Sequence, residues 1–258
     1  MQNYKKKERF LLFISSILLI VIFPLVSSFA AHPLPETERK AIRETFEQRE
    51  TLLSARLLKE PKNVSLYSSR GDARLFLSKF AGAVEDYEKM ILLDPKLDIS
   101  HWRLGIAYYY VEKYAKAAHQ FEIYHGYDNV DRENGIWRYM SQTRSAGPEK
   151  ARRGLLKYEK TDRPPYPWLY SLFAGKMKPD QVLAEIKKAD FNERHEAQVR
   201  FHADLYLGIH YELVGNQAKA LEHLRLATAN AFGRATGTYM WQVARVHHDL
   251  LAAKLAPK

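Results

Sequence analysis

The histidines are the residues of this sequence that could do metal or acid–base chemistry, and the notable ones fall into two groups. His195, His202 and His210 lie roughly along one side of a predicted helix. The run from His247 to Asp249 offers two imidazoles and a carboxylate, but adjacent residues of a helix do not share a face. A metal site needs several ligands that converge in space. The sequence therefore predicts no metal and no cofactor.

Catalytic motifs are missing from the chain. It has no GxSxG nucleophile turn, no GxxxxGK[ST] phosphate loop, no HExxH zinc motif and no GxGxxG dinucleotide loop. It also has no cysteine among its 258 residues, which excludes thiol chemistry, disulfides and a lipidated N-terminal cysteine. We therefore expect a protein that is not an enzyme. The alternative is a hydrolase or metal-dependent activity hidden in the irregular middle of the chain, around His195 and His202.

The N-terminus has the three-part order of a secretory signal. Four basic residues, Lys5, Lys6, Lys7 and Arg9, precede an apolar run at 10–23. Ser28 and Ala30 supply the small residues of a cleavage site. We predict that residues 1–30 are a signal peptide cleaved after Ala30, so that the protein is exported. The apolar run is shorter than the roughly 20 residues that span a bilayer. An uncleaved membrane anchor is the alternative, and membrane contact is expected only through it.

The charge of the chain is basic but not extreme. The formal net charge is +10, and the densest basic stretch, residues 150–163, also contains Glu159 and Asp162. A solvated helix face accounts for such a stretch, and attraction to an anionic polymer is the alternative. Nucleic acid is not an expected partner, because the N-terminal signal removes the chain from the cytosol.

The elements that must position any binding residues come from a repeat with a period of 34 residues. The stretch FAGAVEDYEKMILLDP at 80–95 recurs in altered form as YAKAAHQFEIYHGYDN at 114–129. This period, with glycine, aromatic and small residues at constant offsets, is typical of the tetratricopeptide repeat (TPR), a helix-turn-helix unit. We predict two repeats over 64–131 and a third over 201–234. The residues predicted to pack within the repeats are Gly71, Phe80, Ala83, Tyr87, Gly105, Tyr114, Ala117, Phe121, Gly208 and Ala220.

The remaining segments are predicted to be helical as well. Apolar residues at helical spacing indicate an N-terminal capping helix within 31–63 and a C-terminal capping helix within 235–258. Residues 132–200 span about two repeat lengths and contain proline and glycine breaks. They form either two degenerate repeats or an inserted helical segment. The predicted fold is an all-α TPR solenoid of antiparallel helix-turn-helix repeats with a cap at each end.

A concave surface lined by the first helix of each repeat is the predicted binding site. Three amphipathic rings, Trp102, Tyr109 and Tyr110, fall on neighbouring turns and could hold a peptide. The alternative is that these rings pack against an adjacent helix pair. The residues predicted to form the partner-binding groove are Asp72, Phe76, Trp102, Ile106, Tyr109, Tyr110, Ile209 and Glu212.

Three stretches resemble the NlpI-type tetratricopeptide lipoproteins of the bacterial envelope. They are SHWRLGIAYYYVEKYAKAAHQF, PWLYSLFAGKMKPDQVLAEIKKAD and FHADLYLGIHYELVGNQAKALEHLRLATAN, and the similarity extends over roughly residues 60 to 250. The resemblance implies a periplasmic adaptor that gathers cell-wall hydrolases and a processing protease and that can form a homodimer. Those proteins are tethered by a lipidated cysteine, which this chain lacks.

The expected function is therefore a non-enzymatic scaffold or adaptor in the bacterial periplasm or cell envelope. Its expected partners are other proteins or peptides of the envelope, and a homodimer is implied by the resemblance alone. A membrane-anchored assembly factor is the alternative if the N-terminal segment is retained.

Overall fold

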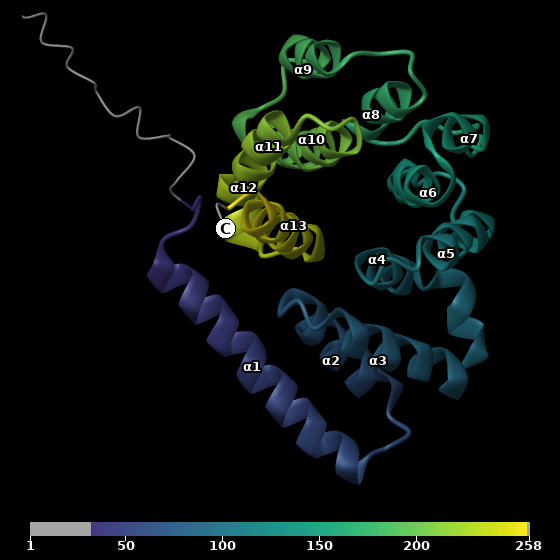
Figure 1. Ribbon diagram of the computed structural model, residues 1–258, viewed down its shortest axis with the longest axis vertical. Helices are drawn as coiled ribbons and strands as arrows, with labels where there is room; N and C mark the ends of the chain where they lie inside the picture. The colour runs from purple at the N-terminus through teal and green to yellow at the C-terminus, as the bar shows by residue number, and fades with distance from the viewer. Residues whose placement is uncertain (1–31, 257–258) are drawn as a thin grey trace, which may run out of the picture. The chain divides into compact units, whose positions relative to one another are not determined.

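The computed structural model describes residues 32–256, and within them the fold is all-α (Figure 1). This range contains thirteen α-helices, one 3-10 helix and no strand. The all-α prediction is confirmed. The predicted signal peptide and its cleavage site at Ala30 lie outside the described residues. Among the helices of 32–256, none combines the length and the apolar character needed to cross a bilayer.

The helices follow one another with short connections. Their bounds are α1 Glu36–Lys59, α2 Val64–Phe76, α3 Phe80–Leu93, η1 Pro95–Ser100, α4 Trp102–Tyr110, α5 Tyr114–Tyr127, α6 Arg132–Ala146, α7 Pro148–Arg153, α8 Tyr166–Phe173, α9 Pro179–Lys188, α10 Glu193–Leu213, α11 Gln217–Ala229, α12 Ala231–Thr236 and α13 Tyr239–Leu255.

Helices that are neighbours in sequence are mostly neighbours in space. α2 packs on α3, α4 on α5, α6 on α7 and α10 on α11. α3 contacts α4, α5 contacts α6, and α8 contacts both α6 and α10. α13 departs from this order, because it packs on α11 and also contacts α2, near the other end of the series. The predicted middle segment, 132–200, holds α6 to α9 and the start of α10, and it joins this series without a gap.

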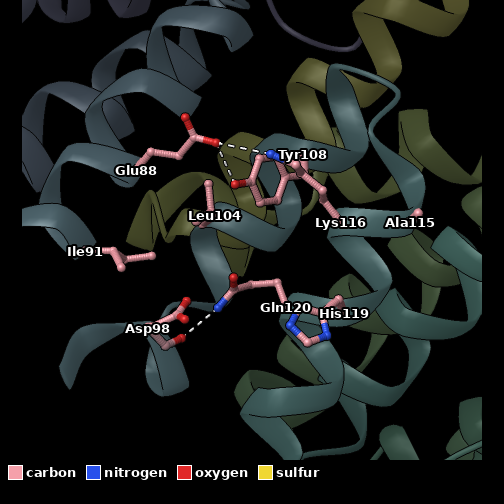
Figure 2. A pocket seen from close by; sticks show the side chains of 9 residues that line it. All are labelled: Glu88, Ile91, Asp98, Leu104, Tyr108, Ala115, Lys116, His119 and Gln120. Atoms are coloured by element: carbon pink, nitrogen blue, oxygen red, sulfur yellow. Dashed lines mark hydrogen bonds and ion pairs between the residues drawn. The ribbon is translucent and has the colours of Figure 1, made fainter. Parts of the chain in front are cut away.

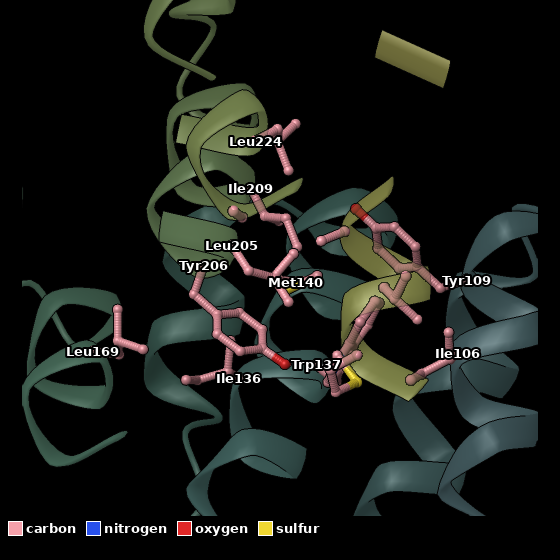
Figure 3. Close-up of a cluster of buried hydrophobic side chains, with 14 of the residues drawn as sticks. Ile106, Tyr109, Ile136, Trp137, Met140, Leu169, Leu205, Tyr206, Ile209 and Leu224 are labelled. Carbon is pink, nitrogen blue, oxygen red and sulfur yellow. Dashed lines mark hydrogen bonds between the residues drawn. The ribbon is translucent and has the colours of Figure 1, made fainter. Parts of the chain in front are cut away.

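One apolar core runs through the helix series. Figure 3 shows its centre, where side chains of α4, α6 and α10 meet. Ile106, Ile136 and Leu205 are fully buried there. Burial of this kind is the main favourable term in folding, at roughly 25 cal/mol per Å² of apolar surface removed from water. The core is continuous from Leu34, which precedes α1, to Leu251 in α13.

In three helix pairs, a glycine of the first helix lies against a large side chain of the second. A Cβ at Gly71 would lie 2.5 Å from the ring of Tyr87, so only glycine lets the two helices approach this closely. The spacing of 34 residues predicted from the sequence therefore corresponds to a recurring contact. The glycine contacts are Gly71 on Tyr87, Gly105 on Phe121 and Gly208 on Leu224.

The turn within each of these pairs also recurs. Ser78, Glu112 and Gly215 have φ values of 61°, 60° and 82°, in the left-handed region. The N–H of the following residue donates to the carbonyl five residues before it at 2.8–2.9 Å, as in a Schellman motif. Gly175, at the end of α8, makes the same turn with a φ of 76°. Of these four positions, Gly175 and Gly215 carry the residue type that a left-handed conformation favours.

Replacing Gly71 by alanine tests the close approach of α2 and α3. The added Cβ would overlap the Tyr87 ring, so we expect Gly71→Ala to lower the free energy of unfolding by about 1–3 kcal/mol. Gly126→Ala in α5 is the matched control, because no described atom lies within 4 Å of a Cβ built there. That change should stabilise the helix by up to about 1 kcal/mol. Urea unfolding of both variants measures the difference, and equal effects would contradict the packing argument.

Candidate functional site

Helix α13 covers part of the surface that the predicted groove residues form. It begins at Thr238, whose side chain accepts a hydrogen bond from the backbone N–H of Trp241. Arg245 of α13 donates to the carbonyl of Phe76 in α2 at 2.7 Å. His247 reaches both α4 and α10, and Figure 1 shows α13 close to these elements. The inner surface of the helix series is therefore occupied in part by a helix of the same chain.

The structure places the predicted groove residues in two environments. Ile106 and Ile209 are fully buried, Tyr109 is 5% exposed and Phe76 is 8% exposed, so these four belong to the core. The remaining four are partly buried beneath or beside α13, and they are Asp72, Trp102, Tyr110 and Glu212. The structure thus differs from the expectation of an open groove along all eight residues. Their role in holding a partner stays a prediction.

The three predicted rings have different neighbours. Tyr109 points into the core and lies 5.4 Å from Trp137 between ring centroids. Tyr110 stacks on Phe80 at 4.8 Å, so packing against neighbouring helices accounts for both tyrosines. Trp102 lies edge-on to Tyr239, the first residue of α13, at 4.8 Å.

A cluster of polar side chains, here called the α13 latch, holds the middle of α13 to α4, α6 and α10. Glu212 is its centre: His247 Nε2 donates to Oε2 at 2.8 Å, and Arg144 donates to Oε1 at 2.8 Å. The hydroxyl of Tyr110 lies 3.1 Å from Nδ1 of His247. Burial alone would raise the pKa of Glu212, but the hydrogen bonds and charges of His247 and Arg144 lower that pKa to about 2.

Neutralising Glu212 should loosen α13. Because the pKa of this carboxyl is depressed, its stabilising effect is present above about pH 4.5 and is lost as the pH falls towards about 2. We expect Glu212→Gln to lower the free energy of unfolding at neutral pH by on the order of 2–3 kcal/mol and by much less near pH 3.

The measurement is urea unfolding at both pH values, together with amide hydrogen exchange along α13. Glu222→Gln, at an exposed position of α11, is the control and should change neither. An equal loss of stability at the two pH values would contradict the role of the ionised carboxylate.

An inner pocket of about 350 Å³ remains beside the N-terminus of α13. Elements far apart in the sequence meet here, namely α4, the start of α6, α10, α12 and the start of α13. Its walls combine aromatic rings with ionisable groups, a composition typical of ligand sites. The aromatic walls are Trp102, Trp137, Phe232 and Tyr239, and the ionisable groups are Asp131, Glu133, Arg163 and His202.

Glu133, in the first turn of α6, has the most unusual environment in the inner pocket. Tyr206 donates its hydroxyl hydrogen to Oε1 of Glu133, and Trp137 donates its indole N–H to the Tyr206 oxygen at 3.0 Å. Arg163 lies 3.8 Å from Oε2, a loose ion pair. Burial, with a smaller contribution from the charge of Asp131, raises the pKa of Glu133 to about 7. Its carboxyl is therefore divided between the neutral and ionised forms near neutral pH.

His202 lies in the inner pocket as a neutral imidazole. Its Nδ1 is 2.8 Å from the hydroxyl of Tyr166, and burial together with the charge of Arg163 lowers its pKa to about 3. The other two histidines that the sequence places along the same side of the helix do not join His202 in the pocket. His195 is exposed at the start of α10 on the ring of Phe191, and His210 lies against Phe173.

Sequence reasoning singled out His202 but missed the rest of this polar group. Glu133, Tyr166 and Tyr206 belong to no motif and are separated by tens of residues, so their convergence has no signal in the sequence. Arg163 lies at the end of the basic stretch 150–163 and here pairs with Asp162 at 3.2 Å.

The pH dependence of stability should reveal Glu133. A carboxyl whose pKa is raised in the folded state favours folding at low pH, and this contribution is lost between about pH 4.5 and pH 7. We expect Glu133→Gln to be more stable than the unmodified chain at about pH 8, by on the order of 2–3 kcal/mol, and equal to it near pH 4.

Thermal unfolding across this pH range checks the expectation, with Glu149→Gln at an exposed position of α7 as the control. If Glu133→Gln and Glu149→Gln show the same profile, the raised pKa of Glu133 is refuted.

A second pocket, of about 540 Å³, lies over η1, α3, α4 and α5 (Figure 2). Its polar side chains are paired with each other. Tyr108 donates to Glu88 at 2.7 Å, Lys116 lies 3.7 Å from the same carboxylate, and Gln120 donates to the backbone carbonyl of Asp98 at 2.6 Å. These pairs account for the polar groups as packing contacts between neighbouring helices.

A scan against known protein families found no family whose model matches this chain. The candidate site therefore stands on its geometry alone.

Proposed function

We propose that this protein is a non-enzymatic adaptor of the bacterial cell envelope, built as a TPR solenoid with capping helices. The 34-residue period of the sequence supports the TPR assignment, as do the recurring contacts of glycine with a large side chain and the recurring left-handed turns. The predicted signal segment supports export. The resemblance to the NlpI-type lipoproteins supports the envelope, where other proteins or peptides, and a second copy of the chain, are the proposed partners.

The observation that carries this proposal is the position of α13. A helix laid on the inner surface of a helix series makes the contacts that helix-in-groove recognition uses, with apolar residues towards the groove and polar pairs at its edge. Here Val243 and Leu251 are buried, and His247 pairs with Glu212. The part of that surface next to the N-terminus of α13 is the inner pocket, where we propose that a segment of the partner binds.

Trp102 is the proposed anchor for that segment. It is half-buried, lines the inner pocket and touches the first residue of α13. Large aromatic side chains in partly enclosed positions account for much of the binding energy in protein interfaces, typically 2 kcal/mol or more each at hot spots.

Affinity capture from envelope extract tests the proposal. The full chain should enrich defined envelope proteins, and Trp102→Ala should weaken binding of a purified partner by roughly 30-fold or more. Trp168→Ala is the matched control, because Trp168 of α8 is also half-buried but lies outside the inner pocket. Retention of full affinity by Trp102→Ala would exclude the pocket as the partner site, and an empty capture would contradict the adaptor function.

A second candidate function is an enzymatic activity in the inner pocket. A carboxyl with a pKa of about 7 beside a neutral imidazole and two tyrosines could transfer protons in a hydrolytic reaction. Activity on cell-wall fragments that is lost in Glu133→Gln would establish this function in place of the adaptor. A membrane-anchored assembly factor is the further alternative, and intact mass of the protein from its host decides it.

A further inference from the structure

Three side chains with metal-binding atoms converge where the segment before α1 meets α13. His32 Nε2 lies 2.7 Å from Asp249 Oδ1, and His248 Nδ1 lies 3.0 Å from the same oxygen. One ligand atom from each of the three residues lies within 4.8 Å of the others. We propose that His32, His248 and Asp249 form a binding site for a divalent transition metal, with Zn²⁺ as the best fit.

The fold assembles this site from residues that are 217 positions apart. Sequence analysis set the run from His247 to Asp249 aside because adjacent helical residues point in different directions. His247 indeed turns away to Glu212 in the α13 latch. His248 and Asp249 nevertheless lie close enough for a hydrogen bond, and His32 from the N-terminal segment supplies the third ligand. That third ligand had no signal in the sequence.

The donor set fits zinc. Two imidazole nitrogens and one carboxylate oxygen match the borderline character of Zn²⁺, and three protein ligands leave a fourth position for water. Ligand atoms around a tetrahedral zinc are about 3.3 Å apart, given Zn–N and Zn–O bonds of about 2.0–2.2 Å. The observed 2.7 and 3.0 Å separations need a small expansion, and the two imidazole nitrogens, which lie within 4.8 Å of each other, must both face the ion. Asp249 can supply it, because its side chain is 40% exposed.

The surroundings of His32 orient it as a metal ligand. Its Nδ1 lies 3.1 Å from the backbone carbonyl of Leu34, and the backbone N–H of the same residue donates to Nδ1 at 3.0 Å when Nε2 carries the proton. Metal binding at Nε2 would displace that proton and favour the other tautomer, in which Nδ1–H donates to the Leu34 carbonyl, the usual arrangement for ligating histidines. The ring of His248 is held edge-on to His32 with centroids 4.9 Å apart, and its side chain is 5% exposed.

One neighbouring charge opposes metal binding. Arg245 lies 3.9 Å from the second oxygen of Asp249, but its guanidinium is also held by the carbonyl of Phe76 at 2.7 Å. Metal at this site would connect the segment before α1 to α13. Because a ligand that binds only the folded form shifts the folding equilibrium towards that form, the metal would stabilise α13 in its position on the inner surface.

Calorimetric titration of the full chain with ZnCl₂ tests the site. We expect one zinc per chain, a melting temperature that rises with zinc and not with equal Mg²⁺, and reversal by EDTA. His32→Ala and Asp249→Asn should each weaken zinc binding at least tenfold. His119→Ala, which removes an exposed histidine of α5, should bind zinc as the unmodified chain does.

The site would be overturned if the unmodified chain showed no saturable zinc binding. It would also be overturned if His32→Ala and Asp249→Asn bound zinc as tightly as the unmodified chain and the His119→Ala control. The two test variants change partly exposed residues, and circular dichroism verifies that they fold. His248→Ala serves as a third variant with the same expected loss. These outcomes are independent of whether the chain captures an envelope partner.

Discussion

The close approach of paired helices is the constraint on which the rest of the structure depends. At Gly71 and Gly105, an aromatic ring of the following helix occupies the space that a Cβ would fill. This contact brings the helix axes together, and the left-handed residue before the second helix turns the chain back at the right distance. Repetition of the same contact and turn aligns successive pairs, so that their first helices contribute to one inner surface.

That inner surface explains the position of α13. Its buried residues, from Met240 to Leu251, need an apolar surface to cover, and α11 and α2 contribute to that surface. Charged groups are costly to bury unless they are paired. The Glu212 carboxylate is compensated by His247 and Arg144, which lets a polar contact persist beneath the helix. The closing helix is therefore held by both apolar packing and a directed hydrogen bond from His247 to Glu212.

The inner pocket buries a carboxyl group that has weaker charge compensation than Glu212. Glu133 is enclosed but only loosely paired with Arg163, so its carboxyl is held less firmly in the ionised state than Glu212. Tyr206 and Trp137 link it to the centre of the core shown in Figure 3. Such incompletely compensated groups lower stability, and their concentration beside aromatic walls is the physical reason to place function here.

The sequence by itself determined the all-α class and the approximate position of the helices. These features are local or periodic. Asp94-Pro95 directly follows the last residue of α3, and Gly71 and Gly105 are separated by the repeat spacing. The contact of Gly71 with Tyr87 lies within a single helix pair, and the period of 34 marked both residues as packing positions without pairing them. Local turn chemistry was predicted less well, since Ser78 and Glu112 adopt left-handed conformations that favour glycine.

Only the tertiary structure decided which surface stays open and which polar groups meet. Nothing periodic in 235–258 indicates that α13, besides packing on α11, also reaches α2 near the other end of the series. The partners of Glu133 and of His32 come from distant segments, and no local pattern of the sequence indicates such pairs. Helical periodicity reports which face of each helix is apolar, whereas the match between faces of distant helices depends on the three-dimensional course of the whole chain.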